Sequence, residues 1–475
     1  MTTTVGSFIS DAFDVVVQQD GKIVAAGFAT NGVNWDIALV RYNGDGTLDD
    51  TFGTGGIVTT DIDGNNDHGG ALVITNDQKI VVAGSSLADP PFYGAVTLAR
   101  YDGNGALDST FGSDGVELLY IDASVIQVTD VALQADGKIL VAGNTDSDHA
   151  FLLRCDANGD PDLSFAQPSG WATAGVVDAT LFSAIAVQPD GKLLAAGTLN
   201  EEPGEVLVVR FQTDGTLDPT FGDGGLAYTY AGGVAAGANA VAVQSDGRII
   251  VGGWFSPTSG DADWLLLRYL PDGSLDPDFD GDGMVSTTFD ADDAVCHALT
   301  LQQDGAILLA GQVEYEPGDI GVARYLVDGT PDPTFGNEGL VATDLGTFYE
   351  GGRGIVLQSD GKILVCGWAA TNGVVSMMVA RYQNDLSSGS DHRPELPVSL
   401  YISPRPTADL CTVVVPFDPK PGTMARVLDL LGRERKKCYL TGSVTQIDVG
   451  DLAPGRYTCM VDHGATRYEG VIVKL

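Results

Sequence analysis

The chain has 475 residues, 44% of them hydrophobic, and its 64 acidic and 25 basic residues give a formal net charge of −39 at pH 7. A chain of this length can bury more than about 70% of its unfolded surface, so it needs no disulfide framework to hold its core. The negative charge argues against nucleic acids, heparin-like polyanions and anionic membranes as partners, because clustered Lys and Arg side chains bind these ligands.

One sequence unit repeats seven times in residues 1–382. A glycine always lies 7 residues after the aspartate that anchors each unit, and an arginine follows that glycine. In the first six units an Asp lies 8 and a Phe 11 residues beyond the arginine, and the next anchor comes 25 residues after the Phe. Only the glycine-to-arginine segment varies, which is typical of a repeat with a rigid frame and one free loop. The anchors are Asp20, Asp77, Asp136, Asp190, Asp246, Asp304 and Asp360.

Each unit predicts four short strands. In the early part of the chain these lie at residues 14–18, 22–26, 37–42 and 57–60, which are rich in aliphatic and β-branched residues and bounded by Gly and Asp. The Asp-Gly turn between the strands at 14–18 and 22–26 is typical of a two-residue hairpin. No segment shows a long apolar period of 3.6 residues, so we expect few helices.

Seven four-stranded units of this length predict an all-β fold, a seven-bladed β-propeller. Such a ring buries each sheet between two neighbouring sheets, which explains a soluble chain with this hydrophobic content. The chain also begins at the position of a first strand, so seven complete units fit within residues 1–382.

The repeat resembles the delta-60 repeat family. The residues that carry the resemblance are Gln18 with the Asp-Gly-Lys-Ile that follows it, the Arg-Tyr at the end of a strand, and the Asp-Gly-Thr-Leu-Asp-Asp-Thr-Phe-Gly of residues 45–53. The resemblance implies a propeller-like repeat domain of bacterial secreted or surface proteins. It implies no particular chemistry.

The repeat arginines are predicted to have a structural role. Residues 1–390 contain 14 basic and 54 acidic residues, and 13 of the basic residues occupy repeat positions, with Arg353 as the exception. We expect each arginine to bind the Asp 8 residues later and to order the connector between blades. The alternative is a central anion channel lined by these side chains. The repeat arginines are Arg41, Arg100, Arg154, Arg210, Arg268, Arg324 and Arg381.

The variable segments carry the candidate ligand-binding residues. In an antiparallel blade these loops lie on one face, and they contain aromatic side chains with carboxylates nearby and no Lys or Arg before the repeat arginine. Aromatic rings beside carboxylates suit stacking on sugars or contact with a peptide; the alternative is packing within the blades. The candidates are Trp35, Phe92, Tyr93, Trp254, Phe255, Trp264, Tyr315 and Trp368.

No catalytic or metal motif accompanies these loops. The sequence has no His-Glu-x-x-His, Gly-x-Ser-x-Gly or Walker motif. Residues 276–283 are similar to a calcium loop but lack the bidentate Glu, so no cofactor is expected and calcium is the alternative. We therefore expect a non-enzymatic scaffold that binds a glycan or a protein. The alternatives are a carboxylate-based glycan hydrolase or lyase on the same face, and a purely structural surface protein.

A second domain follows a polar, Pro-containing linker at residues 383–398. Residues 399–475 predict short strands, and Cys411, Cys438 and Cys459 could form one disulfide. This domain resembles the type A sorting domain of the type IX secretion system, through residues 401–404, 427–433, 447–457 and 473–474, although Ile402 and Ser403 depart from the usual Tyr-Pro-Asn-Pro. An ordinary β-sandwich with a packing role is the alternative.

The resemblance to the sorting domain implies a small Ig-like β-sandwich that binds the type IX secretion machinery of a Bacteroidetes-like bacterium. It also implies an extracellular or outer cell-surface location. The sequence contains no apolar run of about 20 residues, so we expect no membrane insertion. The first residues have no basic start and no apolar core of a signal peptide. We therefore expect an upstream piece of the protein to precede residue 1.

Overall fold

The computed structural model divides into two compact units, Met1–Leu386 and Ser387–Leu475, each described by itself. The structure describes all residues except 88–93, 122–124, 146–148, 174–179, 200–203, 259–261, 290–292, 314–317, 348, 385–397, 400, 404–409, 416–418, 421–422, 429–432, 454, 464–465 and 475. The predicted linker at 383–398 therefore lies almost entirely outside the described residues. The described residues contain no helix long and apolar enough to span a membrane.

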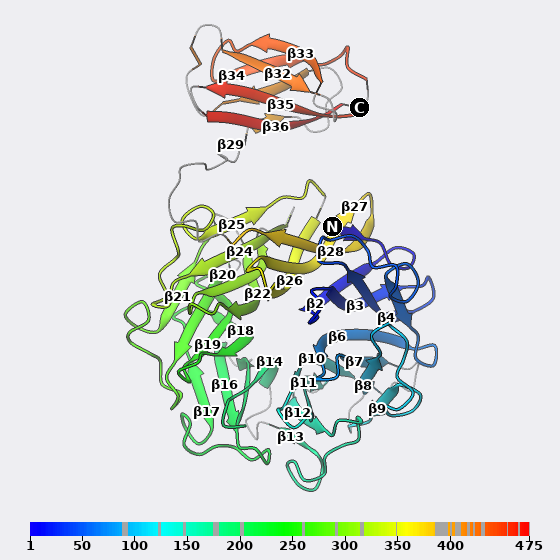
Figure 1. Cartoon of the computed structure of the whole chain (residues 1–475). Coiled ribbons are helices and arrows are strands. Elements are labelled where there is room, and N and C mark those ends of the chain that lie inside the picture. Colours follow the sequence, from blue (N-terminus) through cyan, green and yellow to red (C-terminus); the bar gives the residue numbers. More distant parts are fainter. Residues whose placement is uncertain are drawn as a thin grey trace. The chain divides into compact units, whose positions relative to one another are not determined.

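The first unit is a β-propeller of seven four-stranded antiparallel sheets, as predicted (Figure 1). Blade 1 contains β2 (Ser10–Val17), β3 (Ile23–Thr30), β4 (Trp35–Tyr42) and β5 (Ile57–Thr60). Blade 2 contains β6 (Asn66–Ile74), β7 (Ile80–Leu87), β8 (Gly94–Tyr101) and β9 (Val116–Leu119). Blade 3 contains β10 (Ile126–Leu133), β11 (Ile139–Thr145), β12 (Ala150–Cys155) and β13 (Trp171–Thr173). Blade 4 contains β14 (Thr180–Val187), β15 (Leu193–Leu199), β16 (Glu205–Phe211) and β17 (Leu226–Thr229).

The remaining blades follow the same order. Blade 5 contains β18 (Ala235–Val243), β19 (Ile249–Ser256), β20 (Asp263–Tyr269) and β21 (Met284–Thr287). Blade 6 contains β22 (Ala294–Leu301), β23 (Ile307–Val313), β24 (Asp319–Tyr325) and β25 (Leu340–Thr343). Blade 7 contains β26 (Tyr349–Leu357), β27 (Ile363–Thr371), β28 (Val374–Tyr382) and β1 (Thr2–Thr3).

The start of the chain closes the ring. Strand β1 pairs with β28 of blade 7, with Thr2 opposite Met378, so the last blade takes its outermost strand from the first residues. Each of the other blades likewise takes its outermost strand from the beginning of the next repeat unit. This overlap joins the two ends of the propeller by backbone hydrogen bonds instead of by side-chain packing alone.

The repeat arginine ties each blade to the next one. The Nε atoms of the first six arginines lie 2.7–2.9 Å from the aspartate 8 residues later. Each of these guanidinium groups also lies over the repeat Phe, 4.3–4.8 Å from the ring centroid. Nη1 then donates to the connector of the following blade, as from Arg100 to the Ala157 carbonyl at 2.7 Å. Arg381 donates to the Gly44 carbonyl at 2.7 Å and completes the circle from blade 7 to blade 1.

The first strand of every blade carries a β-bulge at the same place. The register with the second strand shifts by one residue, which leaves one residue of the first strand unpaired in each blade. A bulge redirects the side chains around it, so these strands present extra side chains toward the axis. The seven bulge residues are Phe13, Gly70, Thr129, Ser183, Asn239, His297 and Arg353.

The second unit is the predicted small β-sandwich. Its five-stranded sheet has the order β29-β36-β35-β32-β33, and its three-stranded sheet has the order β30-β31-β34. The strands are β29 (Val398–Ser399), β30 (Tyr401–Ser403), β31 (Leu410–Val414), β32 (Met424–Leu428), β33 (Glu434–Tyr439), β34 (Val444–Asp448), β35 (Gly455–His463) and β36 (Thr466–Lys474). Val413, Val427 and Ile472 belong to one core shared by both sheets. Cys411, Cys438 and Cys459, which could have formed one disulfide, are all free thiols in the structure.

Replacing Asp218 by Asn tests the tie between blades. Asp218 is fully buried and contacts Arg210 at 2.7 Å and Lys192 at 3.0 Å. Burial by itself would raise the pKa of Asp218, but hydrogen bonds from Thr220 and Lys192 and the charge of Arg210 hold it below its usual value. Asp218→Asn leaves the buried guanidinium without its counter-charge, so we expect the free energy of unfolding to fall by about 3 kcal/mol.

Urea unfolding followed by circular dichroism measures this change. The matched control is Asp223→Asn, which removes an exposed carboxylate from the same connector. We expect the control to change the free energy of unfolding by less than about 0.5 kcal/mol. Equal effects of the two substitutions would show that the pair with Arg210 does not hold the connector.

Candidate functional site

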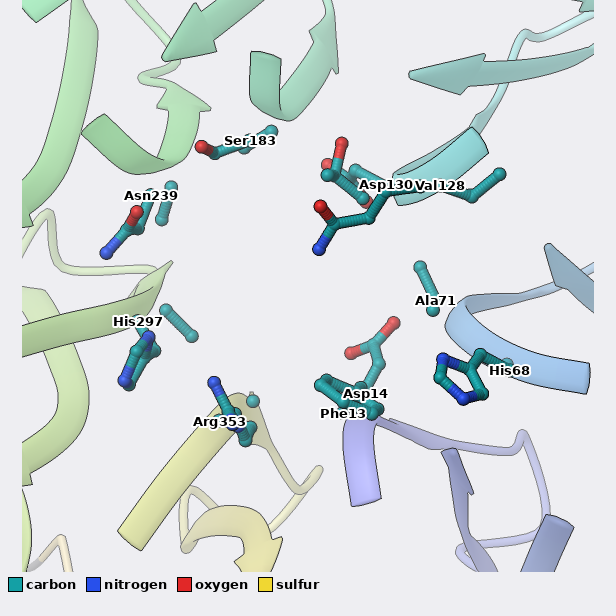
Figure 2. A pocket seen from close by; sticks show the side chains of 18 of the residues that line it. Phe13, Asp14, His68, Ala71, Val128, Asp130, Ser183, Asn239, His297 and Arg353 are labelled. Carbon is teal, nitrogen blue, oxygen red and sulfur yellow. The ribbon is translucent and has the colours of Figure 1, made fainter. Parts of the chain in front are cut away.

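An axial chamber of about 620 Å³ lies where the first strands of all seven blades meet. All seven bulge residues line it, and Figure 2 shows five of their side chains around an open centre, those of Phe13, Ser183, Asn239, His297 and Arg353. Each bulge residue lies 7 residues before its anchor aspartate, so this ring occupies a fixed position of the repeat. Its chemistry nevertheless differs in every blade, in contrast to the uniform frame around it. The chamber is therefore lined by a repeat position whose residue differs in each of the seven units.

Asp14 and Asp130 point into the chamber and also join neighbouring blades (Figure 2). Asp14 accepts hydrogen bonds from the backbone N–H of Val15 at 2.7 Å and of Leu72, in blade 2, at 3.0 Å. Asp130 of blade 3 repeats this pattern with two contacts at 2.7 Å, one of them across to blade 4. The other five blades have only Ala or Gly at this position, namely Ala71, Ala184, Ala240, Ala298 and Gly354.

Burial in the chamber wall changes the protonation of both carboxyl groups. It raises the pKa of Asp14 to about 6, against the lowering effect of the two backbone hydrogen bonds. Burial likewise raises the pKa of Asp130 to about 7, and the charge of Asp14 adds to that increase. Two carboxylates that repel each other in a shared cavity favour a bound proton or a bound cation.

An aromatic arc, formed by Phe13, Phe28, Trp35 and His68, lies beside the variable-loop end of the chamber. The ring centroids of Trp35 and His68 are 4.4 Å apart and stacked, and Phe28 lies 5.1 Å from Trp35. Phe13 continues the arc at 5.9 Å from Phe28 and lines the chamber together with His68. Burial lowers the pKa of His68 to about 4, so its ring is neutral at pH 7, and its Nε2 has no hydrogen-bond partner.

Arg353 extends the aromatic arc on its blade 7 side. Its guanidinium lies 5.1 Å from the Phe13 centroid and 4.6 Å from that of Trp368. Nη2 lies 3.7 Å from a carboxylate oxygen of Asp11. Burial raises the pKa of Asp11 to about 6, with Arg353 acting in the opposite direction. Burial and the charge of Arg353 together lower the pKa of His297 to about 3, so this histidine is also neutral at pH 7.

The structure separates the sequence-predicted aromatic residues. Trp35 is 38% exposed and belongs to the aromatic arc. Trp254 and Phe255 are half-buried on β19 and contribute to neither the arc nor the chamber lining. The other three candidates lie outside the described residues, and these are Phe92, Tyr93 and Tyr315.

Two of the predicted ligand-binding tryptophans are corrected to packing residues. Trp264 is 0% exposed, packs with its ring tilted against Phe289 at 4.6 Å between centroids, and donates from Nε1 to the Gln312 carbonyl at 3.4 Å. It fits against blade 6 because Gly321 there has no Cβ, which would lie only 2.8 Å from the indole. Trp368 is 6% exposed and supports the guanidinium of Arg353 instead of facing solvent.

Sequence reasoning missed most of the chamber. Phe13, His68 and the two chamber carboxylates lie on β2, β6 and β10, strands that the sequence predicts only as parts of the frame. One signal was present, because Arg353 is the only basic residue of the first 390 that lies outside the repeat positions. The repeat arginines, in contrast, do not line the chamber among the residues that the structure describes, which disfavours an anion channel.

Among the described residues, one group of three acidic side chains is close enough together to hold a metal ion. Carboxylate oxygens of Asp319, Asp344 and Glu350 lie within 4.8 Å of one another, a donor set suited to a hard cation. Glu350 already accepts hydrogen bonds from the Leu345 N–H and the Thr347 hydroxyl. In the calcium-like segment 276–283, Asp276 is engaged by the Nε atoms of two arginines, each at 2.8 Å.

Comparison with known families identifies the repeat. The sequence matches a β-propeller family described as a domain of unknown function, DUF5122, and the chain belongs to this family. The matched segments are residues 18–52, 75–111, 134–165, 188–221, 244–279, 302–335 and 358–387, one in each repeat unit. Comparison of the sequence with curated proteins found no match.

Solved structures with a similar fold include proteins of several kinds. Sqt1 from Chaetomium thermophilum has a TM-score of 0.44 at 14% identity, over 80% of this chain and all of that one. The β-propeller domain of the Trilobed protease from Pyrococcus furiosus has a TM-score of 0.43 at 11% identity, over 80% and 95%. A PL25 ulvan lyase has a TM-score of 0.43 at 9% identity, over 79% of this chain and 95% of that one.

The chamber carboxylates predict a pH dependence of stability. Their pKa values are higher in the folded chain than the value of about 4 expected after unfolding. Between about pH 4 and 7 the folded state therefore holds more protons than the unfolded state. The contribution of these groups to the free energy of unfolding is complete below about pH 4 and is lost as the pH rises through 6 and 7. In Asp14→Ala/Asp130→Ala we expect a smaller loss of stability across this range.

Urea unfolding of both proteins at intervals from pH 4 to pH 8 measures the difference. Alanine occupies the same position in four other blades, so the substitution suits the backbone. Asp11, whose pKa is also raised, is present in both proteins and drops out of the comparison. Parallel curves for the two proteins would contradict the assignment of raised pKa values to Asp14 and Asp130.

Proposed function

We propose that this DUF5122 β-propeller is a non-enzymatic binding scaffold whose ligand contacts the variable-loop face at the mouth of the axial chamber. The observation that carries the proposal is the continuous run of the aromatic arc into the chamber. Phe13 and His68 belong to both, and Trp35 offers a partly exposed ring beside them. Aromatic platforms of this kind bind the apolar faces of sugars and the side chains of peptides.

The contacts of the chamber carboxylates favour binding over hydrolysis or elimination. In both Asp14 and Asp130, each of the two oxygens accepts a backbone N–H, and one of these contacts in each pair crosses to the next blade. These contacts fix both side chains as links between blades, which suits them to hold a charge beside a ligand, whereas a general acid or base must also reach a reacting atom of the substrate. We therefore place a carboxylate-based glycan hydrolase or lyase, and a purely structural role, second to binding.

The proposal includes export to the cell surface or the medium. Its support is the resemblance of residues 399–475 to a sorting domain of the type IX secretion system, together with their fold as a separate small β-sandwich. In this account the C-terminal unit binds the secretion machinery, and the propeller binds the external ligand. The test is a fluorescent protein that carries a signal peptide and is fused to residues 387–475, produced in a bacterium that has this secretion system. This fusion should reach the cell surface. The same protein without residues 387–475 should remain inside the cell.

Trp35→Ala tests the ligand site. We expect a screen of the full chain on glycan and peptide arrays to find a ligand, and the substitution to weaken its binding at least tenfold, because Trp35 supplies the exposed ring of the arc. Tyr120→Ala is the matched control, since Tyr120 is 69% exposed in a different blade. If wild type and Trp35→Ala bind the ligand equally and have equal melting temperatures, the ligand does not bind at the aromatic arc.

A further inference from the structure

We propose that the axial chamber receives a cationic group, an amine or a guanidinium, between Asp14 and Asp130. This inference rests on the proposed function and deepens it, because it names the chemistry of the part of the ligand that enters the propeller. The cation could belong to a small polyamine or to a basic side chain of a polypeptide. Both sources offer the same group to the chamber.

A recess in the wall lies between the two carboxylates. Blade 2 separates blade 1, which carries Asp14, from blade 3, which carries Asp130, and its bulge residue is Gly70. Gly70 is the only member of the bulge ring without a side chain, and a Cβ there would lie 2.6 Å from the Val128 carbonyl oxygen. Close backbone packing therefore keeps this position free of a side chain, and Figure 2 shows the small side chain of Ala71 on the same part of the wall.

The carboxylate oxygens beside the recess can accept further hydrogen bonds from a ligand. Each oxygen of Asp14 and Asp130 accepts one backbone N–H, and a carboxylate oxygen has room for a second donor. The hydroxyl of Thr129, which also lines the chamber, is buried without a partner. An ammonium or guanidinium would supply donors to these atoms and would offset the repulsion between the two carboxylates.

The other charged and titratable groups of the chamber leave this preference intact. His68 and His297 line the chamber and are neutral at pH 7, because burial lowers their pKa values. Arg353 is the one cation among the described lining residues, and its charge faces Asp11 at 3.7 Å while its planar group lies against two aromatic rings. Residues 1–390 carry a net charge of −40, which steers cations toward the propeller.

The aromatic arc fits the rest of such a ligand. A lysine or arginine side chain has an apolar stem that packs on aromatic rings, while its charged end reaches further. Trp35 and Phe28 continue the arc beyond the chamber lining, and the chamber of about 620 Å³ is large enough for the stem and the charged end of one such side chain. The arc and the carboxylates would thus bind two parts of the same group.

Calorimetric titration of the full chain at pH 7.5 tests the inference with three probes. These are spermidine, the peptide acetyl-Gly-Lys-Gly-amide, and the neutral peptide acetyl-Gly-Gln-Gly-amide. We expect at least one cationic probe to bind, the glutamine peptide not to bind, and the affinity of the cationic probe to fall at least tenfold in Asp14→Ala/Asp130→Ala. Binding of spermidine alone identifies a free amine as the ligand, and binding of the lysine peptide identifies a basic side chain.

A charge-matched variant separates a specific site from general attraction. Asp50→Ala/Asp223→Ala removes two exposed carboxylates from connectors and should keep the wild-type affinity. An equal loss of affinity in both double variants, or no binding of any cationic probe, would overturn the inference. A third outcome is an array ligand that has no cationic group, binds the wild type and does not bind Trp35→Ala. This outcome would support the proposed function and contradict the inference of a cationic group.

A measurement on the wild-type protein keeps the test independent of the folding of the variants. At pH 6.5 a carboxyl group with a pKa of about 7, as for Asp130, is largely protonated, and a cation bound beside it would displace that proton. The heat of binding of the cationic probe should therefore differ between buffers with different heats of ionisation, as net proton release requires. Equal heats in such buffers would place the cation away from Asp14 and Asp130.

Discussion

The interaction on which the rest of the propeller depends is the contact of each repeat arginine with the aspartate 8 residues later and with the connector of the next blade. Six arginines make that ion pair at 2.7–2.9 Å, and Arg381 returns the chain of contacts to blade 1. A guanidinium buried without its partners would strongly destabilise the folded protein. These contacts therefore fix the spacing between strand and connector. Length can vary where this tie does not reach, in the loops of the opposite face.

A fixed frame also allows the inner ring of side chains to differ from blade to blade. Because the outer connectors and the cores between sheets hold the blades, the bulge position needs no common residue, and it ranges from Gly70 to Arg353. The result is an asymmetric chamber. Aromatic and cationic groups gather at blades 7, 1 and 2, while carboxylates project from blades 1 and 3. A symmetric repeat thus encloses a site with a defined orientation.

The sequence predicts the fold well and the site only in part. Invariant spacings determine the blade number, and the arginine frame follows from charges at fixed offsets. Loop length places Trp35 on the variable-loop face, but it does not tell which loop residues turn inward, and Trp264 packs against Gly321 of the next blade. Phe13 and His68 were missed because a bulge changes the direction of side chains only once the strands are paired in register.

The central claim is that a ligand binds at the variable-loop end of the axis. Hydrogen–deuterium exchange of the full chain, with and without the ligand found on the arrays, tests this claim most directly. The account predicts slower exchange in the segment from β3 to β4 around Trp35 and in the first strands β2, β6 and β10, with no change in the arginine connectors. Protection confined to the connectors or to residues 387–475 would contradict it.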